Sequence, residues 1–223
     1  FNILKEIAKK NKFKLQDIHG ELIKIKKFSI KYKNDFKIKN LAMAINAAKL
    51  CGLKEKSIYK TLKKLKDVDG RLELVRKFSN NIKVFIDYAH TPDALLKSLL
   101  SLKSNYISGI NLVFGCGGDR DKKKRKMMAK IANNNCKKIY VTDDNPRNED
   151  PKKIRNHLLK YISKNKAFNI GSRALAIKAA IQNAAANEIV LIAGKGHEDY
   201  QIYRNKKLKI SDKKIVKRIN VKF

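Results

Sequence analysis

Val84-Phe85-Ile86-Asp87 is an apolar run typical of a buried strand, and a helical pattern follows it at residues 93–103. The same alternation recurs to the end of the chain. Further strands are predicted at residues 111–115, 138–142 and 189–193, and further helices at 123–133, 151–161 and 172–185. Apolar strands that alternate with amphipathic helices predict an α/β fold, a mostly parallel sheet with helices on both faces. Ligands of such sheets bind beyond the carboxyl ends of the strands.

The segment before this alternation has a different pattern. Residues 3–39 contain short alternating runs such as Leu22-Ile23-Lys24-Ile25 and Phe28-Ser29-Ile30, which predict strands at the edge of something larger. Helical patterns follow at residues 40–50, where Gly52 is placed to cap the helix end, and at 54–65. A turn at Asp69-Gly70-Arg71 closes this segment.

Composition limits the class of protein. The chain has 223 residues, of which 43% are apolar and 33% charged, as in globular proteins and unlike disordered or membrane-embedded ones. The formal net charge is +33, but 44 of the 53 basic residues are lysines scattered through every segment. A nucleic-acid binder would concentrate arginine and aromatic residues on one surface. We therefore expect no specific nucleic-acid partner and no membrane association.

The cysteines and the chain start give two further expectations. Cys51, Cys116 and Cys136 are an odd number without C-x-x-C spacing, which argues against a disulfide framework and a zinc site and favours a reducing compartment. No apolar run has the length of a membrane span, and we expect no secretory leader. The chain begins at Phe1 within a sequence that reads as folded, so we expect a fragment.

Polar clusters follow each of the four predicted strands. The first is Asp87-Tyr88-Ala89-His90-Thr91-Pro92-Asp93-Ala94-Leu95. It offers a carboxylate and an imidazole for the ribose, base or metal-bound phosphates of a nucleotide. The alternative is plain helix capping, with Thr91 or Asp93 as N-cap, Pro92 near the first helical position and His90 merely exposed.

The second cluster is Gly115-Cys116-Gly117-Gly118-Asp119-Arg120-Asp121. Its glycines allow a ligand to approach the backbone, and Arg120 and Arg125 could bind carboxylate or phosphate. The alternative is a generic glycine-rich turn before a solvated basic helix. The run matches neither G-x-G-x-x-G nor a P-loop, so it predicts no dinucleotide or Walker site.

The third cluster spans residues 142–151, Thr-Asp-Asp-Asn-Pro-Arg-Asn-Glu-Asp-Pro. Such a run fits a small zwitterion, with Asp144 facing an ammonium and Arg147 binding a carboxylate through two hydrogen bonds. An Asx-type turn leading to a helix with Pro151 at its start explains the backbone, but it leaves Arg147 unexplained.

The fourth cluster is Ala193-Gly194-Lys195-Gly196-His197-Glu198-Asp199-Tyr200-Gln201. Its glycines again permit close approach, and His197 and Glu198 form a titratable pair. Alone it would be an ordinary turn. Four such clusters at one edge of a sheet favour a binding site.

Taken together, Asp-Tyr-Ala-His-Thr-Pro-Asp-Ala-Leu, Val-Phe-Gly-Cys-Gly-Gly-Asp-Arg-Asp, Thr-Asp-Asp-Asn-Pro-Arg and Ala-Gly-Lys-Gly-His-Glu-Asp-Tyr-Gln resemble the C-terminal part of Mur ligases. The resemblance is strong from Asn40 to Tyr203 and weak before it. It implies a Rossmann-like C-terminal domain at residues 72–223 that carries the amino-acid acceptor site. Residues 1–71 would be the end of an α/β ATP-binding central domain.

The resemblance also implies site residues. Within this family the sequence is similar to the members that add meso-diaminopimelate, and their pocket would consist of Arg120, Asp144, Asn145, Pro146, Arg147, Gly194 and Glu198. Diaminopimelate differs from lysine by one carboxylate, and a facing arginine would be left unpaired by lysine, which gives strong discrimination. The positions that resemble ATP contacts are Asn40, Arg71, Asp87 and His90.

The implied reaction is ATP-dependent amide bond formation in peptidoglycan synthesis. ATP, with Mg²⁺, phosphorylates the D-glutamate carboxylate of UDP-N-acetylmuramoyl-L-alanyl-D-glutamate, and the amine of diaminopimelate attacks the acyl phosphate. The chain lacks G-x-x-x-x-G-K-[ST], the domain for the UDP moiety and the central lysine segment. We therefore expect no ligase activity from this chain alone, and we assign it no catalytic residue and no metal ligand.

The resemblance further implies a cytoplasmic protein that is a monomer when full length. Three alternatives remain open. The piece could work alone as an amino-acid-binding module, it could belong to a Mur or folate-type ligase for another amino acid, or it could be a decayed gene product.

Overall fold

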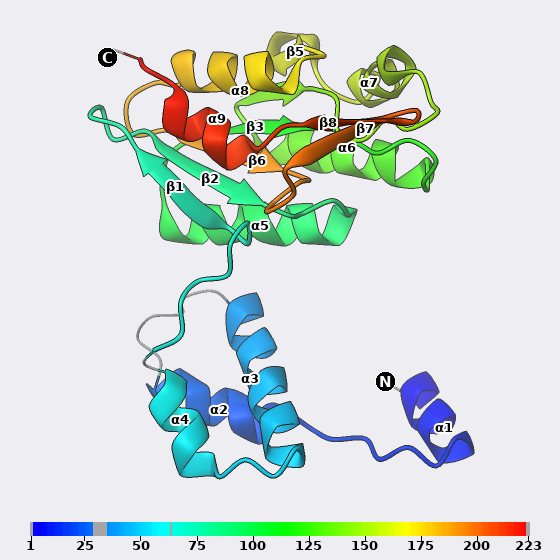
Figure 1. Cartoon of the computed structure of the whole chain (residues 1–223), viewed down its shortest axis with the longest axis vertical. Helices are drawn as coiled ribbons and strands as arrows, with labels where there is room; N and C mark the ends of the chain where they lie inside the picture. The colour runs from blue at the N-terminus through cyan, green and yellow to red at the C-terminus, as the bar shows by residue number, and fades with distance from the viewer. Residues whose placement is uncertain (1, 29–34, 63, 222–223) are drawn as a thin grey trace. The chain divides into compact units, whose positions relative to one another are not determined.

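The computed structural model describes residues 2–28, 35–62 and 64–221, and the chain divides into two units, Phe1–Lys66 and Asp67–Phe223 (Figure 1). This division lies near the predicted boundary after residue 71. The first unit contains α1 (Asn2–Lys10), α2 (His19–Phe28), α3 (Asp35–Leu50) and α4 (Glu55–Leu62). Its small core joins α2, α3 and α4 and consists of Ile25, Ile38, Ala42, Ile45 and Ile58.

The prediction of strands within residues 3–39 is wrong where the structure describes them. Leu22-Ile23-Lys24-Ile25 lies in α2, where Leu22 and Ile25, three positions apart, share the face that packs on the small core. A four-residue alternation is too short to separate a strand from one helical turn. Phe28 ends α2, and Ser29 and Ile30 lie outside the described residues.

The helices predicted after these runs are confirmed. α3 begins earlier than predicted, at Asp35, and ends at Leu50. Gly52 follows with a φ of 81°, the left-handed conformation that glycine adopts without strain, and its N–H donates to the Lys49 carbonyl. α4 is the second predicted helix.

The second unit is built on a six-stranded sheet in the order β1-β2-β6-β3-β4-β5. Its strands are β1 (Glu73–Lys77), β2 (Lys83–Asp87), β3 (Ile110–Phe114), β4 (Lys138–Val141), β5 (Ala167–Asn169) and β6 (Ile189–Ala193). Only β1 is antiparallel to its neighbour. The four predicted strands form the centre of this sheet. The two edge strands were not predicted, because they are only partly buried and lack a continuous apolar run.

Helices cover both faces of this sheet (Figure 1). One face packs against α8 (Arg173–Gln182) and α9 (Asp212–Arg218), and its core includes Val84, Ile86 and Val190. Residues one position along the strands, such as Phe85 and Leu191, are equally buried and point to the opposite face, because side chains alternate along a strand. That face carries α5 (Pro92–Asn105), α6 (Lys123–Asn135) and α7 (Pro151–Leu159).

A hairpin that the sequence did not predict completes the unit. β7 (Tyr200–Tyr203) and β8 (Lys206–Lys209) pair antiparallel, and Tyr203 forms a bridge with Arg147 in the loop after β4. A short 3-10 turn, Lys164–Lys166, precedes β5. Within the ranges described above, no helix has the length and apolar character needed to cross a membrane.

Candidate functional site

The carboxyl ends of β2, β6, β3 and β4 lie side by side, because these strands are parallel neighbours in the sheet. The four polar clusters therefore meet, and they surround a cavity of about 390 Å³. The cavity is lined by Tyr88, His90, Thr91, Gly115, Cys116, Gly117, Arg120, Asp121, Lys124, Asp144, Asn145, Arg147, Gly194 and Glu198.

Six of the seven residues predicted for the diaminopimelate pocket line this cavity, and Pro146 is the exception. Pro146 instead lies against the glycine-rich loop, where a Cβ added to Gly118 would stand 1.8 Å from the Pro146 carbonyl oxygen. The loops after β3 and β4 are thus in backbone contact, which requires glycine at this position.

Replacing Gly118 with alanine should therefore destabilise the second unit by about 1–3 kcal/mol, because one loop must move away from the other. Denaturant unfolding followed on both units measures this. Gly20→Ala is the control, since a Cβ at this position in α2 meets nothing within 4 Å. An unchanged transition of the second unit in Gly118→Ala would contradict the close approach.

Hydrogen bonds hold both the backbone and the side chain of Arg147. Its backbone has a φ of 51°, its N–H donates to the Ile202 carbonyl at 3.0 Å, and its own carbonyl accepts from Arg204 at 2.7 Å. The guanidinium Nη1 donates to the carbonyl oxygens of Gly118 at 2.8 Å and Asn145 at 3.4 Å. Nε and Nη2 have no hydrogen-bond partner within the described part of the chain. The side chain thus keeps donors for an anionic ligand group in the cavity.

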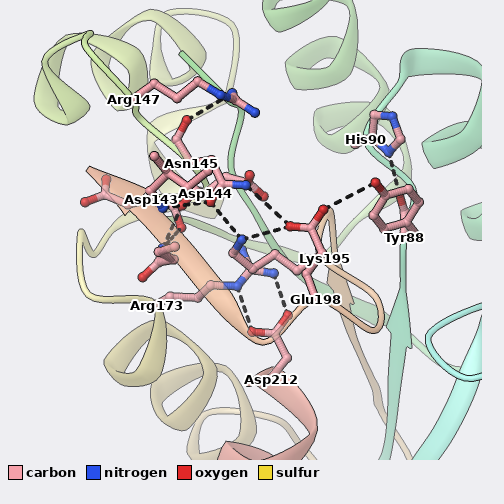
Figure 2. Close-up of polar contacts among 12 residues, drawn as sticks. Tyr88, His90, Asp143, Asp144, Asn145, Arg147, Arg173, Lys195, Glu198 and Asp212 are labelled. Carbon is pink, nitrogen blue, oxygen red and sulfur yellow. Dashed lines mark hydrogen bonds and ion pairs between the residues drawn. The ribbon is translucent and has the colours of Figure 1, made fainter. Parts of the chain in front are cut away.

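Glu198 is fixed by neighbours from three segments (Figure 2). Its Oε2 lies 3.3 Å from the Lys195 ammonium and accepts from Asn145 Nδ2 at 3.4 Å, and its Oε1 accepts from the Tyr88 hydroxyl at 3.3 Å. Burial and the Glu198 charge raise the pKa of Tyr88, so that the hydroxyl remains a donor. No role was predicted for Tyr88 from the sequence.

The predicted ATP contacts do not all reach the cavity. His90 lines it and binds the Tyr88 carbonyl through Nδ1 at 2.8 Å. Arg71 stacks its guanidinium 4.3 Å from the centre of the Tyr88 ring. Asn40 belongs to the first unit, where it is exposed on α3. The role of these residues in ATP binding stays a prediction.

Asp87, the fourth predicted ATP contact, is buried at the end of β2. Its carboxylate accepts from the Ala89 N–H at 2.8 Å and from the Ser98 hydroxyl at 3.1 Å. Burial raises the pKa of Asp87, and these hydrogen bonds and Arg71 oppose that shift. The carboxylate thus anchors the loop between β2 and α5, and Thr91 is the N-cap of that helix.

Arg125 does not offer its guanidinium to a ligand, as the sequence had indicated. It is buried and pairs with Glu149 through two hydrogen bonds of 2.8 and 3.0 Å, and it also donates to the Gly117 carbonyl. The hydrogen bonds from Arg125 lower the pKa of Glu149. Glu149 also accepts from the Asp119 N–H at 2.8 Å. This pair joins the glycine-rich loop to the loop after β4.

A second buried ion pair joins Arg173 and Asp212 (Figure 2). Arg173 donates through Nε to Asp212 Oδ1 at 2.8 Å and through Nη2 to Oδ2 at 2.7 Å. Nη2 also donates to the carbonyl of Ala193, the last residue of β6. The pair therefore connects α8 and α9 to the strand end that leads into Gly194. No local sequence signal marks either residue.

The described ranges hold no group of three or more His, Cys, Asp or Glu side chains placed to bind an ion. Cys51, Cys116 and Cys136 are free thiols, and burial raises the pKa of Cys116 to about 12. Cys116 at the cavity wall is thus a neutral small residue.

Comparison with known proteins decides the family. The profile described as "Mur ligase, glutamate ligase domain" matches residues 70–196, more than half of the chain. This chain belongs to the Mur ligase family. The match covers all four clusters up to Gly196, and it confirms the resemblance seen in the sequence.

Individual Mur ligases agree with this assignment. The chain is 43% identical over 185 residues to a UDP-N-acetylmuramoyl-L-alanyl-D-glutamate--2,6-diaminopimelate ligase of Rickettsia montanensis, an alignment that covers 82% of this chain and 38% of the relative. It is 39% identical over 180 residues to the ligase of that name from Vibrio vulnificus, covering 80% and 36%. The chain therefore spans less than two fifths of the length of these relatives.

Solved Mur ligase structures confirm the α/β fold. A UDP-N-acetylmuramoyl-L-alanyl-D-glutamate--2,6-diaminopimelate ligase superposes with a TM-score of 0.63 at 36% identity, covering 82% of this chain and 38% of that one. A UDP-N-acetylmuramate-alanine ligase from Thermotoga maritima superposes with a TM-score of 0.56 at 20% identity, covering 74% and 36%, which shows a shared fold alone.

Proposed function

We propose that this chain forms the amino-acid acceptor site of a Mur ligase that adds meso-diaminopimelate to UDP-N-acetylmuramoyl-L-alanyl-D-glutamate in peptidoglycan synthesis. The supporting observation is the cavity at the strand ends, where the guanidiniums of Arg120 and Arg147 and the carboxylates of Asp144 and Glu198 line one space. Diaminopimelate carries both ammonium and carboxylate groups, and the wall offers charged side chains of both signs to bind them.

The reaction that we propose uses these residues for positioning. Asp144 and Glu198 bind the ammonium at one end of the amino acid, and Arg147, with Arg120 beside it, binds a carboxylate. This arrangement directs the other amine toward the activated carboxylate of the second substrate. ATP supplies the phosphoryl group that activates that carboxylate.

The ATP site is only partly formed by this chain in our proposal. Arg71 and His90 would contribute to one wall, since the guanidinium and the imidazole can contact phosphate or base. Mg²⁺ would be held by parts of the ligase outside the described residues, because these supply no cluster of metal ligands. The full-length protein would act on small molecules as a cytoplasmic monomer, and its free thiols agree with a reducing compartment.

The whole chain should bind meso-diaminopimelate in the absence of ATP and release no ADP when ATP and both substrates are added. Isothermal titration with meso-diaminopimelate and with L-lysine tests the binding, and a coupled ADP assay tests the turnover. Steady substrate-dependent ADP release would contradict the expected inactivity. Binding of L-lysine as tight as that of diaminopimelate would favour a ligase for another amino acid.

A further inference from the structure

Lys195 is an unusual lysine in this protein. Most of the 44 lysines are at least partly exposed, but the Lys195 side chain is 0% exposed and is among the largest fully buried side chains. An ammonium removed from water destabilises a fold unless it is paired and hydrogen-bonded. A buried apolar residue would fill the same space without that penalty, so the charge itself requires an explanation.

The two glycines beside Lys195 give the backbone an unusual conformation. Gly194 and Gly196 have φ values of 113° and 54°, which L side chains rarely adopt. A Cβ on Gly194 would lie 2.7 Å from the Asp144 carboxylate, and one on Gly196 would lie 2.8 Å from Tyr88 Cβ. The two glycines thus let the loop pass closely between the other clusters.

The ammonium contacts two residues of the cavity wall. Nζ donates to Asn145 Oδ1 at 3.0 Å and lies 3.3 Å from Glu198 Oε2, and the Tyr200 ring centre is 5.6 Å away (Figure 2). Asn145 and Glu198 line the cavity, whereas Lys195 does not. Lys195 is therefore placed behind the residues that would touch a ligand.

These contacts fix which way the Asn145 amide points. Its Oδ1 accepts both from Lys195 Nζ and from the Ile202 N–H, at 3.0 Å each. Because both neighbours are donors, the amide oxygen must face them and Nδ2 must face Glu198. Without the ammonium, the amide would lose one of its two donors, and Glu198 would lose its only ion-pair partner among the described residues.

We propose that Lys195 is a positioning residue of the amino-acid pocket, whose buried ammonium fixes the Asn145 amide and the Glu198 carboxylate for binding of the diaminopimelate ammonium. This inference rests on the proposed function. The Lys195 charge also balances one of the two acidic side chains in the wall, Asp144 and Glu198, so that their repulsion does not move Glu198 out of place.

The test compares four variants of the whole chain by isothermal titration with meso-diaminopimelate. Lys195→Met should weaken binding about 10- to 100-fold, the effect of a lost charge-assisted hydrogen bond. Lys137→Met is the matched control, because Lys137 also pairs with a glutamate, Glu188, but at the opposite end of the sheet. It should leave the affinity unchanged.

Glu198→Gln and the double variant Lys195→Met/Glu198→Gln complete a cycle. If Lys195 acts through Glu198, the double variant should bind no more weakly than the weaker single variant. Losses that simply multiply would indicate a general structural effect and overturn the proposal, as would unchanged affinity in Lys195→Met. Failure of the wild-type chain to bind meso-diaminopimelate would instead overturn the proposed function.

A measurement on the wild-type chain covers the case in which Lys195→Met does not fold. Exposed lysine ammonium groups exchange protons too fast to be seen by ¹⁵N–¹H correlation at neutral pH, whereas a buried, hydrogen-bonded ammonium should give a signal. We expect this signal to shift on addition of meso-diaminopimelate and not of sodium chloride. If meso-diaminopimelate binds and the Lys195 signal does not shift, the proposal is overturned.

Discussion

Replacing Arg147 with alanine should lower the affinity of the chain for meso-diaminopimelate by about 1.5–3 kcal/mol, which is roughly 10- to 100-fold. Arg147 is held by the Gly118 and Asn145 carbonyls and keeps Nε and Nη2 for a ligand carboxylate. L-Lysine lacks the second carboxylate, so its weaker binding should not change. The variant should therefore lose most of its discrimination between the two amino acids.

Isothermal titration of both amino acids into wild type and variant measures this loss. Arg218→Ala is the control, because Arg218 is exposed in the last turn of α9 and does not line the cavity. Unchanged diaminopimelate affinity in Arg147→Ala would contradict the assignment. An equal loss of affinity for both amino acids would show that Arg147 shapes the pocket but does not bind the second carboxylate.

Removing one partner of the Arg173–Asp212 pair should have the largest effect on folding. Both side chains are 0% exposed, so Asp212→Ala would leave a buried guanidinium unpaired and should lower the free energy of unfolding of the second unit by about 3–5 kcal/mol. The double variant Arg173→Met/Asp212→Leu should recover much of this loss, because it removes both buried charges.

Denaturant unfolding of wild type, Asp212→Ala and the double variant measures these free energies. The control is Lys97→Ala, which breaks a pair of the same 2.7 Å length between Asp93 and Lys97 that is largely exposed. Lys97→Ala should lower the free energy of unfolding by at most about 1 kcal/mol. If Asp212→Ala were as mild as Lys97→Ala, the buried pair would not be what joins α8 and α9 to the end of β6.

Local sequence patterns were sufficient to predict the four central strands of the sheet. The buried strands β2, β3, β4 and β6 are continuous apolar runs, and the polar clusters stand directly after them, so parallel pairing alone brings the clusters together. Strands were wrongly predicted within residues 3–39, because a single helical turn and a short strand can share the same alternation of apolar and polar residues. The identity of residues 1–71 as part of a central domain stays a prediction.

The sequence by itself determined that Asp144, Asn145, Arg147 and Glu198 share one site, since each follows a strand of the same sheet. Tertiary structure alone decided which residues support them. Lys195 lies 50 positions from Asn145, and Arg173 lies 39 from Asp212. Which residues pair over such separations depends on how the loops and helices pack against the sheet. Hydrophobic periodicity indicates only which face of its own helix or strand a residue occupies, so it cannot predict these pairs.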